Sequence, residues 1–149
     1  MRFFSPVVKF KTIRMMFAIV AHYDLELEQL DVKTAFLHGD LDEKIYMKQP
    51  AGFIDSHHPN YVSLLKRFLY GLKQSPRQWY KCFDTFVMNV GFNRSKYDCC
   101  FYFMLYDSIP VYLLLYVDDM LLISKSKSKI VELKRVLNTK FEYEGFRQC

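Results

Sequence analysis

The stretch from Val111 to Ile123 constrains the fold of this chain most, because it is an apolar run with two adjacent carboxylates, Asp118 and Asp119, inside it. The flanking segments are rich in Val, Leu, Ile and Tyr and are too short to span a membrane, so each is typical of a buried strand. Together they predict a hairpin that turns at the two aspartates. At such a turn both side chains can lean toward one point and share a cation, since adjacent ionised carboxylates otherwise raise one another's pKa. The alternative is that Asp is a common turn residue and both simply face water.

Composition favours one folded domain with a basic surface. The 149 residues are 51% hydrophobic and 17% aromatic, which is ample for a core and argues against disorder. The net charge of +5 suits a polyanionic partner without requiring one. The four cysteines form no CxxC pair, and no signal segment or membrane-spanning run occurs, so we expect a reduced intracellular location, cytoplasmic or nuclear.

The first half of the chain predicts a helix followed by strands. Apolar residues recur at helical spacing between about Pro6 and His22, at Ile13, Met16, Phe17 and Val20. A strand is expected over Leu25–Val32, and its alternation places Asp31 on the face opposite Leu30 and Val32. Short strands are expected over residues 44–48 and 61–65, with a loop over 55–60 between them.

The second half predicts two more helices around the hairpin. One begins at Ser75-Pro76, carries an apolar stripe and ends at Gly91; its stripe is Trp79, Phe83, Phe86, Val87 and Val90. A strand over residues 101–106 leads into the hairpin, and a third helix is expected between about Lys127 and Lys140. We therefore predict an α+β domain in which helices lie on one face of a mainly antiparallel sheet, without internal repeats or a dividing linker.

In that plan Asp31, at the end of one strand, meets Asp118 and Asp119 on the open face of one sheet. Carboxylate oxygens are the ligands that Mg²⁺ prefers, and it completes its octahedron with water and substrate phosphates. Two such ions, roughly 3.5–4 Å apart, would serve an in-line displacement at phosphorus. The three aspartates therefore predict a site for phosphoryl transfer.

Three strings carry a resemblance to a known family. They are Leu30-Asp-Val-Lys-Thr-Ala-Phe-Leu-His-Gly39, Leu69-Tyr-Gly-Leu-Lys-Gln-Ser-Pro-Arg-Gln-Trp-Tyr80 and Leu115-Tyr-Val-Asp-Asp-Met120. In this order they resemble the motifs of reverse transcriptases, specifically those of copia-type long-terminal-repeat retrotransposons. Shorter strings agree with the same family: Phe4-Ser-Pro-Val-Val8, Ile45-Tyr-Met-Lys-Gln-Pro50 and Asp98-x-Cys100-x-Tyr102. The resemblance covers residues 3 to 142.

The resemblance implies a right-hand polymerase fold, with a palm sheet that is backed by helices and a partial fingers region. It implies RNA-directed DNA synthesis with two Mg²⁺ ions, or Mn²⁺, on a primed RNA or DNA template with deoxynucleoside triphosphates. By position, Asp31 and Asp118 match the catalytic aspartates that hold the metal, and Asp119 matches the neighbouring acid.

The resemblance also implies nucleotide contacts. Phe36 matches the aromatic side chain that lies against the sugar of the incoming nucleotide, although an aromatic in an apolar string is usually part of a core. The backbone around Val32, Lys33, Thr34 and Ala35 is expected near the triphosphate. Gly71, Gln74 and Arg77 match the motif that contacts template and nucleotide, and Arg77 is equally well explained as a solvated charge at a helix start.

Other groupings have weaker support. The pairs His57-His58 and Cys99-Cys100 lack the spacing of a structural zinc site. The helical spacing of Trp79, Phe83 and Phe86 favours core packing over base stacking. A basic stretch fits a nucleic-acid backbone and a solvated helix face equally well; it comprises Lys125, Lys127, Lys129, Lys134 and Arg135.

At the C-terminal end the resemblance stops at Glu142, before the string Tyr143-Glu-Gly-Phe-Arg-Gln-Cys149. The chain is expected to be a fragment, residues 1–149, of a Pol polyprotein reverse transcriptase, without the upstream fingers segment, the thumb and the ribonuclease H domain. Two classes of function follow. One is a polymerase domain from a truncated copy, and the other is an inactive retrotransposon remnant that at most binds nucleic acid.

Overall fold

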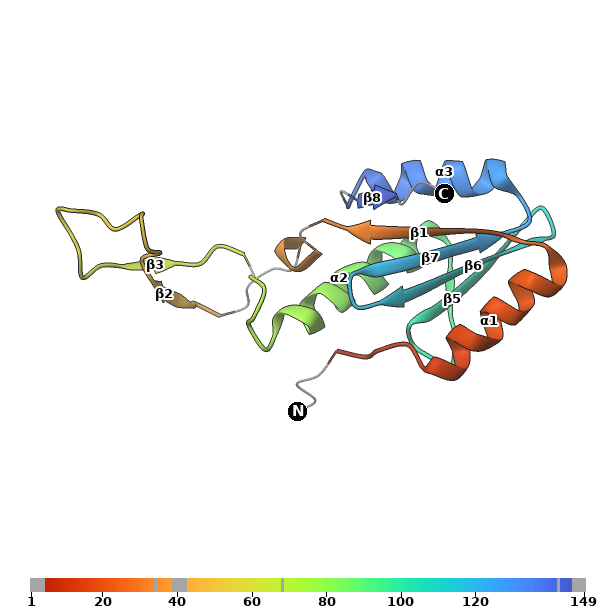
Figure 1. Ribbon diagram of the computed structural model, residues 1–149, viewed down its shortest axis with the longest axis horizontal. Helices are drawn as coiled ribbons and strands as arrows, with labels where there is room; N and C mark the ends of the chain where they lie inside the picture. Colours follow the sequence, from red (N-terminus) through yellow and green to blue (C-terminus); the bar gives the residue numbers. More distant parts are fainter. Residues whose placement is uncertain (1–4, 34, 39–42, 68, 142, 146–149) are drawn as a thin grey trace.

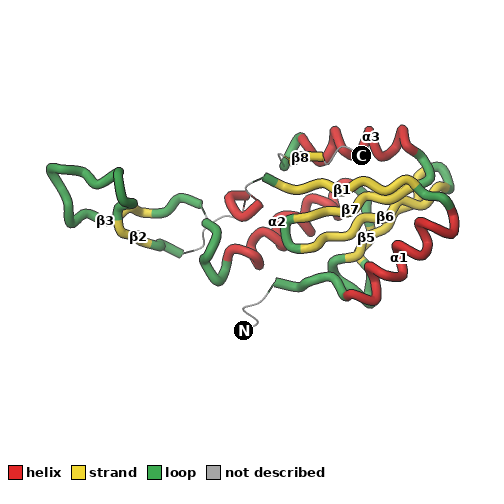
Figure 2. Tube along the Cα trace, viewed as in Figure 1, coloured by secondary structure: helices red, strands yellow, loops and turns green. Residues whose placement is uncertain are grey.

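Pairing between distant strands builds the main sheet of this computed structural model, which describes residues 5–33, 35–38, 43–67, 69–141 and 143–145. Its six strands lie in the order β4-β5-β6-β7-β1-β8, and every neighbouring pair is antiparallel. Figure 2 shows β5, β6, β7 and β1 side by side as one yellow layer. The strands are β1 (Glu26–Val32), β4 (Asn93–Arg94), β5 (Phe101–Tyr106), β6 (Ile109–Tyr116), β7 (Asp119–Ser124) and β8 (Tyr143–Gly145). The α+β prediction with an antiparallel sheet is confirmed.

Three helices cover this sheet, and they lie on both of its faces. They are α1 (Phe10–Tyr23), α2 (Ser75–Val90) and α3 (Lys127–Asn138). In Figure 1, α2 runs behind the strands and α1 lies in front of them, near β5. The prediction that all helices lie on one face is therefore wrong. The physical reason is in β6, where Leu113, Leu114 and Leu115 are all buried, because successive strand residues point to opposite faces and both faces must then be covered.

The core between the sheet and α2 is aromatic. Phe141 contacts the rings of Trp79, Phe83 and Phe86 with centroid distances of 5.0, 5.9 and 5.1 Å. Tyr102 of β5 packs edge-on against Phe83 at 5.9 Å. The predicted stripe of α2 is thus core packing, and Gly91 ends the helix with φ 111°, as expected for a left-handed cap.

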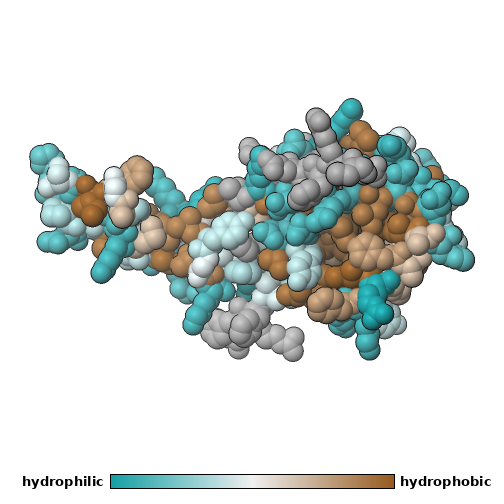
Figure 3. Space-filling model, in the orientation of Figure 1, coloured by the Kyte–Doolittle hydropathy of each residue, from teal (hydrophilic) through white to brown (hydrophobic). Residues whose placement is uncertain are grey.

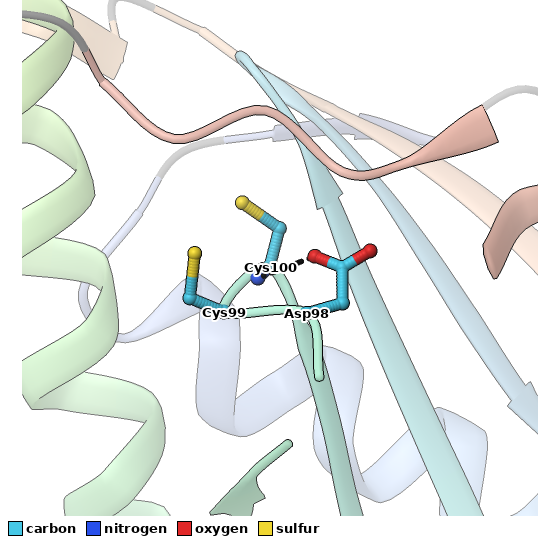
Figure 4. Close-up of side chains that lie close together, drawn as sticks. All are labelled: Asp98, Cys99 and Cys100. Atoms are coloured by element: carbon cyan, nitrogen blue, oxygen red, sulfur yellow. Dashed lines mark hydrogen bonds between the residues drawn. The ribbon is translucent and has the colours of Figure 1, made fainter. Parts of the chain in front are cut away.

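Helix α1 begins at Phe10 instead of near Pro6, because its N-terminus is fixed by a residue far along the chain. Asp98 is only 5% exposed, and its Oδ2 accepts hydrogen bonds from Lys9 N (2.9 Å) and Thr12 Oγ1 (2.6 Å). Its other oxygen, Oδ1, accepts from Cys100 N at 3.1 Å, the dashed line in Figure 4. The carboxylate therefore satisfies a free N–H at the start of α1 and places negative charge at the positive end of the helix.

An arm of chain leaves the body on the left of Figure 1 and carries a separate two-stranded sheet, β2 (Tyr46–Lys48) with β3 (Val62–Leu64). Gln49 organises its loop: Nε2 donates to His58 O (2.9 Å) and Tyr61 O (3.0 Å), and Oε1 accepts from Asp55 N at 2.7 Å. Large apolar side chains such as Phe53 and Ile54 are exposed here, and brown surface is visible on the arm in Figure 3.

Two further sequence expectations are resolved by the fold. In the basic stretch, Lys129 is buried beside Glu132 (2.8 Å) and over the Tyr106 ring, and Lys134 pairs with Glu28. Two of the five cations are thus bound within the protein, so the stretch is not a continuous basic surface.

Among the helices that the structure describes, none is both long and apolar enough to cross a membrane.

We predict that Asp98→Ala lowers the free energy of unfolding by about 2–3 kcal/mol, because it leaves the buried Cys100 N–H and two partly buried donors, Lys9 N and Thr12 Oγ1, without their acceptor. Asp55→Ala is the control, since that carboxylate accepts two hydrogen bonds, against three at Asp98, but is exposed. Urea unfolding followed by circular dichroism measures both variants. Equal losses in the two would contradict the role of Asp98 as a buried anchor.

Candidate functional site

The carboxylates singled out in the sequence lie on neighbouring strands at one end of the sheet. In the β1–β7 register Asp31 is directly opposite Asp119, and Val32 N donates to Asp118 O at 3.1 Å. Directly opposite residues in an antiparallel pair share a face, with Cβ atoms about 4.5–5.5 Å apart. Leu30 and Val32 are buried on the other face. The strand phase expected for Asp31 is therefore confirmed, and Asp31 and Asp119 share one face.

The hairpin turns one residue earlier than the sequence indicated. Strand β6 ends at Tyr116, which pairs with Asp119, so the two-residue turn is Val117-Asp118 and Asp119 already belongs to β7. This register pairs Leu115 with Met120 and Leu113 with Leu122, and all four are buried. Burial of these residues therefore fixes the turn, and Asp118 and Asp119 do not occupy the two turn positions together.

Val117 is strained at this turn. Its φ is 58°, in the left-handed region that β-branched residues rarely adopt and that hairpin turns usually fill with glycine. Trp79 of α2 holds the turn in place, since its indole Nε1 donates to Val117 O at 2.6 Å while the side chain is 1% exposed. The sequence predicted Trp79 only as core, because helical spacing reveals burial but not the partner of the indole N–H. The chain thus positions Asp118 through a partly buried hydrogen bond from a residue 38 positions earlier, on α2.

Donor side chains lie against the carboxylates. Gln29 Nε2 donates to Asp119 Oδ1 at 3.2 Å, from two residues before Asp31 on the same face of β1. The Tyr70 phenol hydrogen-bonds to Asp118, and its pKa is raised by burial, by the charges of Asp118 and Asp31, and by that bond. Tyr70 is therefore close to both acids. Neither residue was singled out beforehand, although Tyr70 lies inside a recognised string and Gln29 lies at strand period from Asp31.

The loop before α2 places Tyr70 there. Ser75 Oγ donates to Leu69 O at 2.7 Å, and Gly71 adopts φ 94°, a conformation that suits glycine. Gln74 is the residue before the first turn of α2, and Arg77 lies within that turn. The loop and the first turn of α2 therefore carry three of the residues expected to contact template and nucleotide, next in sequence to Tyr70.

The segment after β1 contains the residues that were expected near the triphosphate. Val32 is buried and its N–H bonds to Asp118 O, so in this structure that amide is part of the sheet. Ala35 is buried in the short helix η1 (Ala35–His38), and Lys33 is exposed. Thr34 and the side chain of Phe36, for which nucleotide contacts are expected, lie outside the described residues.

The donor set fits a hard divalent cation. Three carboxylates at one end of the sheet supply the oxygen ligands that Mg²⁺ prefers. In the free protein, hydrogen bonds from Tyr70 and Gln29 to Asp118 and Asp119 offset the repulsion between the carboxylates. Within the described ranges, the one group of three His, Cys, Asp or Glu side chains whose ligand atoms all lie within 4.8 Å is Asp98, Cys99 and Cys100. The three site aspartates are thus adjacent but more widely spread than that group.

The sheet face that bears Asp31 and Asp119 also carries aromatic rings. The ring of Phe101 stacks on that of Tyr112 with a centroid distance of 5.9 Å, and its centroid lies 6.4 Å from that of Phe103. The three residues belong to strands β5 and β6. Figure 3 shows apolar side chains gathered over the strands in this view. The arrangement combines acids at one end of a sheet with an apolar floor beside them.

Comparison with known proteins gives one family. The family model described as "Reverse transcriptase (RNA-dependent DNA polymerase)" matches residues 1–149. The chain is 50% identical over 140 residues to the retrovirus-related Pol polyprotein from transposon TNT 1-94 of Nicotiana tabacum, covering 93% of this chain and 10% of the relative. It is 43% identical over 119 residues to the Pol polyprotein from transposon RE1 of Arabidopsis thaliana, covering 80% and 8%.

A shorter relative is the putative transposon Ty5-1 protein of Saccharomyces cerevisiae, 38% identical over 108 residues, which covers 72% of this chain and 35% of that protein. No solved structure matches at a significant level. The chain therefore spans only about a tenth of the plant polyproteins that it resembles.

We predict that Trp79→Phe lowers the free energy of unfolding by about 1–2 kcal/mol, since the ring remains but Val117 O loses a buried donor. Phe86→Leu is the control, because it also reduces an α2 aromatic in the same core but makes no hydrogen bond to the turn. Amide hydrogen exchange at residues 116–119 separates the two variants. Faster exchange there is expected only in Trp79→Phe, and equal exchange would contradict the role of the indole.

Val117→Gly is expected to leave the free energy of unfolding unchanged or raise it by up to about 1 kcal/mol, because glycine adopts the positive φ without strain. Val131→Gly is matched in exposure, 41% against 37%, but lies within α3, where it should cost about 1 kcal/mol or more. Thermal unfolding compares them. A loss at Val117 as large as that at Val131 would show that the turn carries no strain.

Proposed function

Because the chain belongs to the reverse transcriptase (RNA-dependent DNA polymerase) family, we propose that it is the palm, with part of the fingers, of such a polymerase, and that Asp31, Asp118 and Asp119 form its catalytic site. The supporting observation is the register of β1 against β7, which brings acids from distant strings to one end of the sheet. The substrates proposed are a primed RNA or DNA template and deoxynucleoside triphosphates.

In this proposal Asp31 and Asp118 are the main metal ligands and Asp119 assists them. Two bound Mg²⁺ ions would lower the pKa of the primer 3′-hydroxyl and neutralise charge on the departing pyrophosphate. The reaction joins the primer oxygen to the α-phosphorus and breaks the bond to pyrophosphate. The protein contributes mainly position, since misplacement of reacting groups by about 1 Å can cost on the order of a hundredfold in rate.

The donors around the acids have a defined part in this scheme. Tyr70 and Gln29 bond to Asp118 and Asp119 in the free protein, which holds the carboxylates in place before metal and nucleotide arrive. Gly71 and Gln74 lie in the same loop as Tyr70, and Arg77 lies in the first turn of the helix that follows. All three are proposed to contact template and nucleotide. Lys33 and the backbone near Thr34 and Ala35 are proposed to lie near the triphosphate, and Phe36 near its sugar.

The arm and the charge of the chain fit a nucleic-acid partner. The arm extends from the body on the side where β1 ends, so we propose that it is the fingers portion. The net charge of +5 supports salt-sensitive binding to a phosphate backbone. Within the Pol polyprotein, the remaining segments are proposed to complete the grip on primer and template.

The test is primer extension by a chimera in which this chain replaces the matching 140 residues of the tobacco relative. With Mg²⁺ or Mn²⁺ the chimera should extend a primed RNA template. Asp31→Asn or Asp118→Asn should reduce extension by at least about a hundredfold, because a charged ligand at the reacting centre is lost.

The control is Asp107→Asn, which changes an aspartate at the other hairpin turn, at a positive φ that asparagine tolerates. Its extension should equal that of the parent chimera. Retained extension in Asp118→Asn would reject the proposed site. A parent chimera that binds primed template but does not extend it would favour an inactive remnant.

A further inference from the structure

Two cysteines that the proposed polymerase site does not use lie side by side on the body. Cys99 and Cys100 follow Asp98 in a turn that leads into β5. Adjacent residues of a strand point to opposite faces, but at this turn the two sulfurs project to the same side, as Figure 4 shows. The potential ligand atoms of Asp98, Cys99 and Cys100 all lie within 4.8 Å of one another.

The carboxylate of this group is already committed. Asp98 accepts from Lys9 N, Thr12 Oγ1 and Cys100 N, and these bonds fix the start of α1. Taking Asp98 as a metal ligand would weaken that anchor. A structural zinc ion uses four protein ligands, and the paired histidines His57 and His58 lie in the loop between β2 and β3, whereas the cysteines precede β5 of the main sheet. What remains is a site of two sulfurs.

Hydrogen bonds hold the backbone of the two cysteines in a fixed relation. Tyr80 Oη donates to Cys99 O at 2.8 Å, and Leu115 N donates to Cys100 O at 2.9 Å. With the Cys100 N bond to Asp98, both peptide groups of the pair are pinned to α2, β6 and the turn. The entropy of bringing two thiols together is therefore already lost on folding, which favours a ligand that binds both.

Access is through Cys99. Its side chain is exposed and lines an open pocket of about 600 Å³ together with Tyr80, Arg94 and Lys96. Cys100 is fully buried, and burial, followed by the nearby Cys99 and Asp98, raises the pKa of its thiol. Cys100 thus stays protonated and is a poor nucleophile by itself. A reagent would attach first to Cys99 and then close onto Cys100 within the same molecule.

We propose that Cys99 and Cys100 form a dithiol site for a thiophilic centre that is satisfied by two sulfurs, of which trivalent organic arsenic is the chemical class. With an arsenoxide, each S–H gives up its proton to the arsenic-bound oxygen, which leaves as water, while two S–As bonds form. Arsenic stays trivalent and both sulfurs keep their oxidation state, so neither an oxidant nor a reductant is needed. The site is independent of the aspartates and of polymerase activity.

The probe is phenylarsine oxide, added to the reduced chain and followed by intact mass and peptide mapping. We expect one phenylarsenic group per chain, on the peptide that contains both cysteines. Excess glutathione should leave it in place, whereas dimercaptopropanol should remove it, because only a dithiol competes with a two-sulfur chelate. An adduct that glutathione removes would overturn the proposal.

Cys99→Ser is the decisive variant, since the side chain is exposed and its loss should not affect folding. Its apparent affinity for the arsenical should fall at least tenfold, and any residual adduct should be removed by glutathione. Cys82→Ser is the matched control and should bind like the parent. A glutathione-resistant adduct that survives in Cys99→Ser, or that disappears in Cys82→Ser, would place the site elsewhere and reject the inference.

Discussion

The register between β1 and β7 is the constraint on which the rest of the structure depends. Leu30 lies opposite Met120 and both are fully buried, so a slip by one residue would move them to the other face and bring Asp31 into the core. An ionised carboxylate in that position would cost several kcal/mol. Burial of apolar residues on one face thereby fixes the place of the acids on the other, without any attraction between the acids themselves.

The turn between β6 and β7 shows how the core and the site are connected. Pairing of the leucines leaves only two residues to reverse the chain, and one of them is Val117, which is forced to a positive φ. Such a conformation persists only where surrounding contacts determine it, and the indole of Trp79 supplies one. The helix that covers the back of the sheet therefore also sets the position of Asp118 at its end.

Much of this architecture was predictable from periodicity. The strand at 26–32, the helix at 75–90 and the phase of Asp31 all follow from alternating or helical spacing. The start of α1 could not be predicted, because it is anchored by Asp98, which lies 86 residues after Thr12 in the sequence. The two residues of the β6–β7 turn could not be predicted either, because the register of the buried leucines determines them. Periodicity reports which face is apolar, but the partner of a polar group depends on tertiary structure.

The pairing of β1 has a consequence for synthesis of the chain. Its partner strands β7 and β8 begin at Asp119 and Tyr143, so the residue that pairs with Asp31 is synthesised 88 residues after it. At ribosomal rates this is an interval of roughly 4–18 seconds. During it, β1 and the N-terminus of α1 lack the contacts that hold them in the folded protein, and an unpaired strand edge is a template for association with other chains.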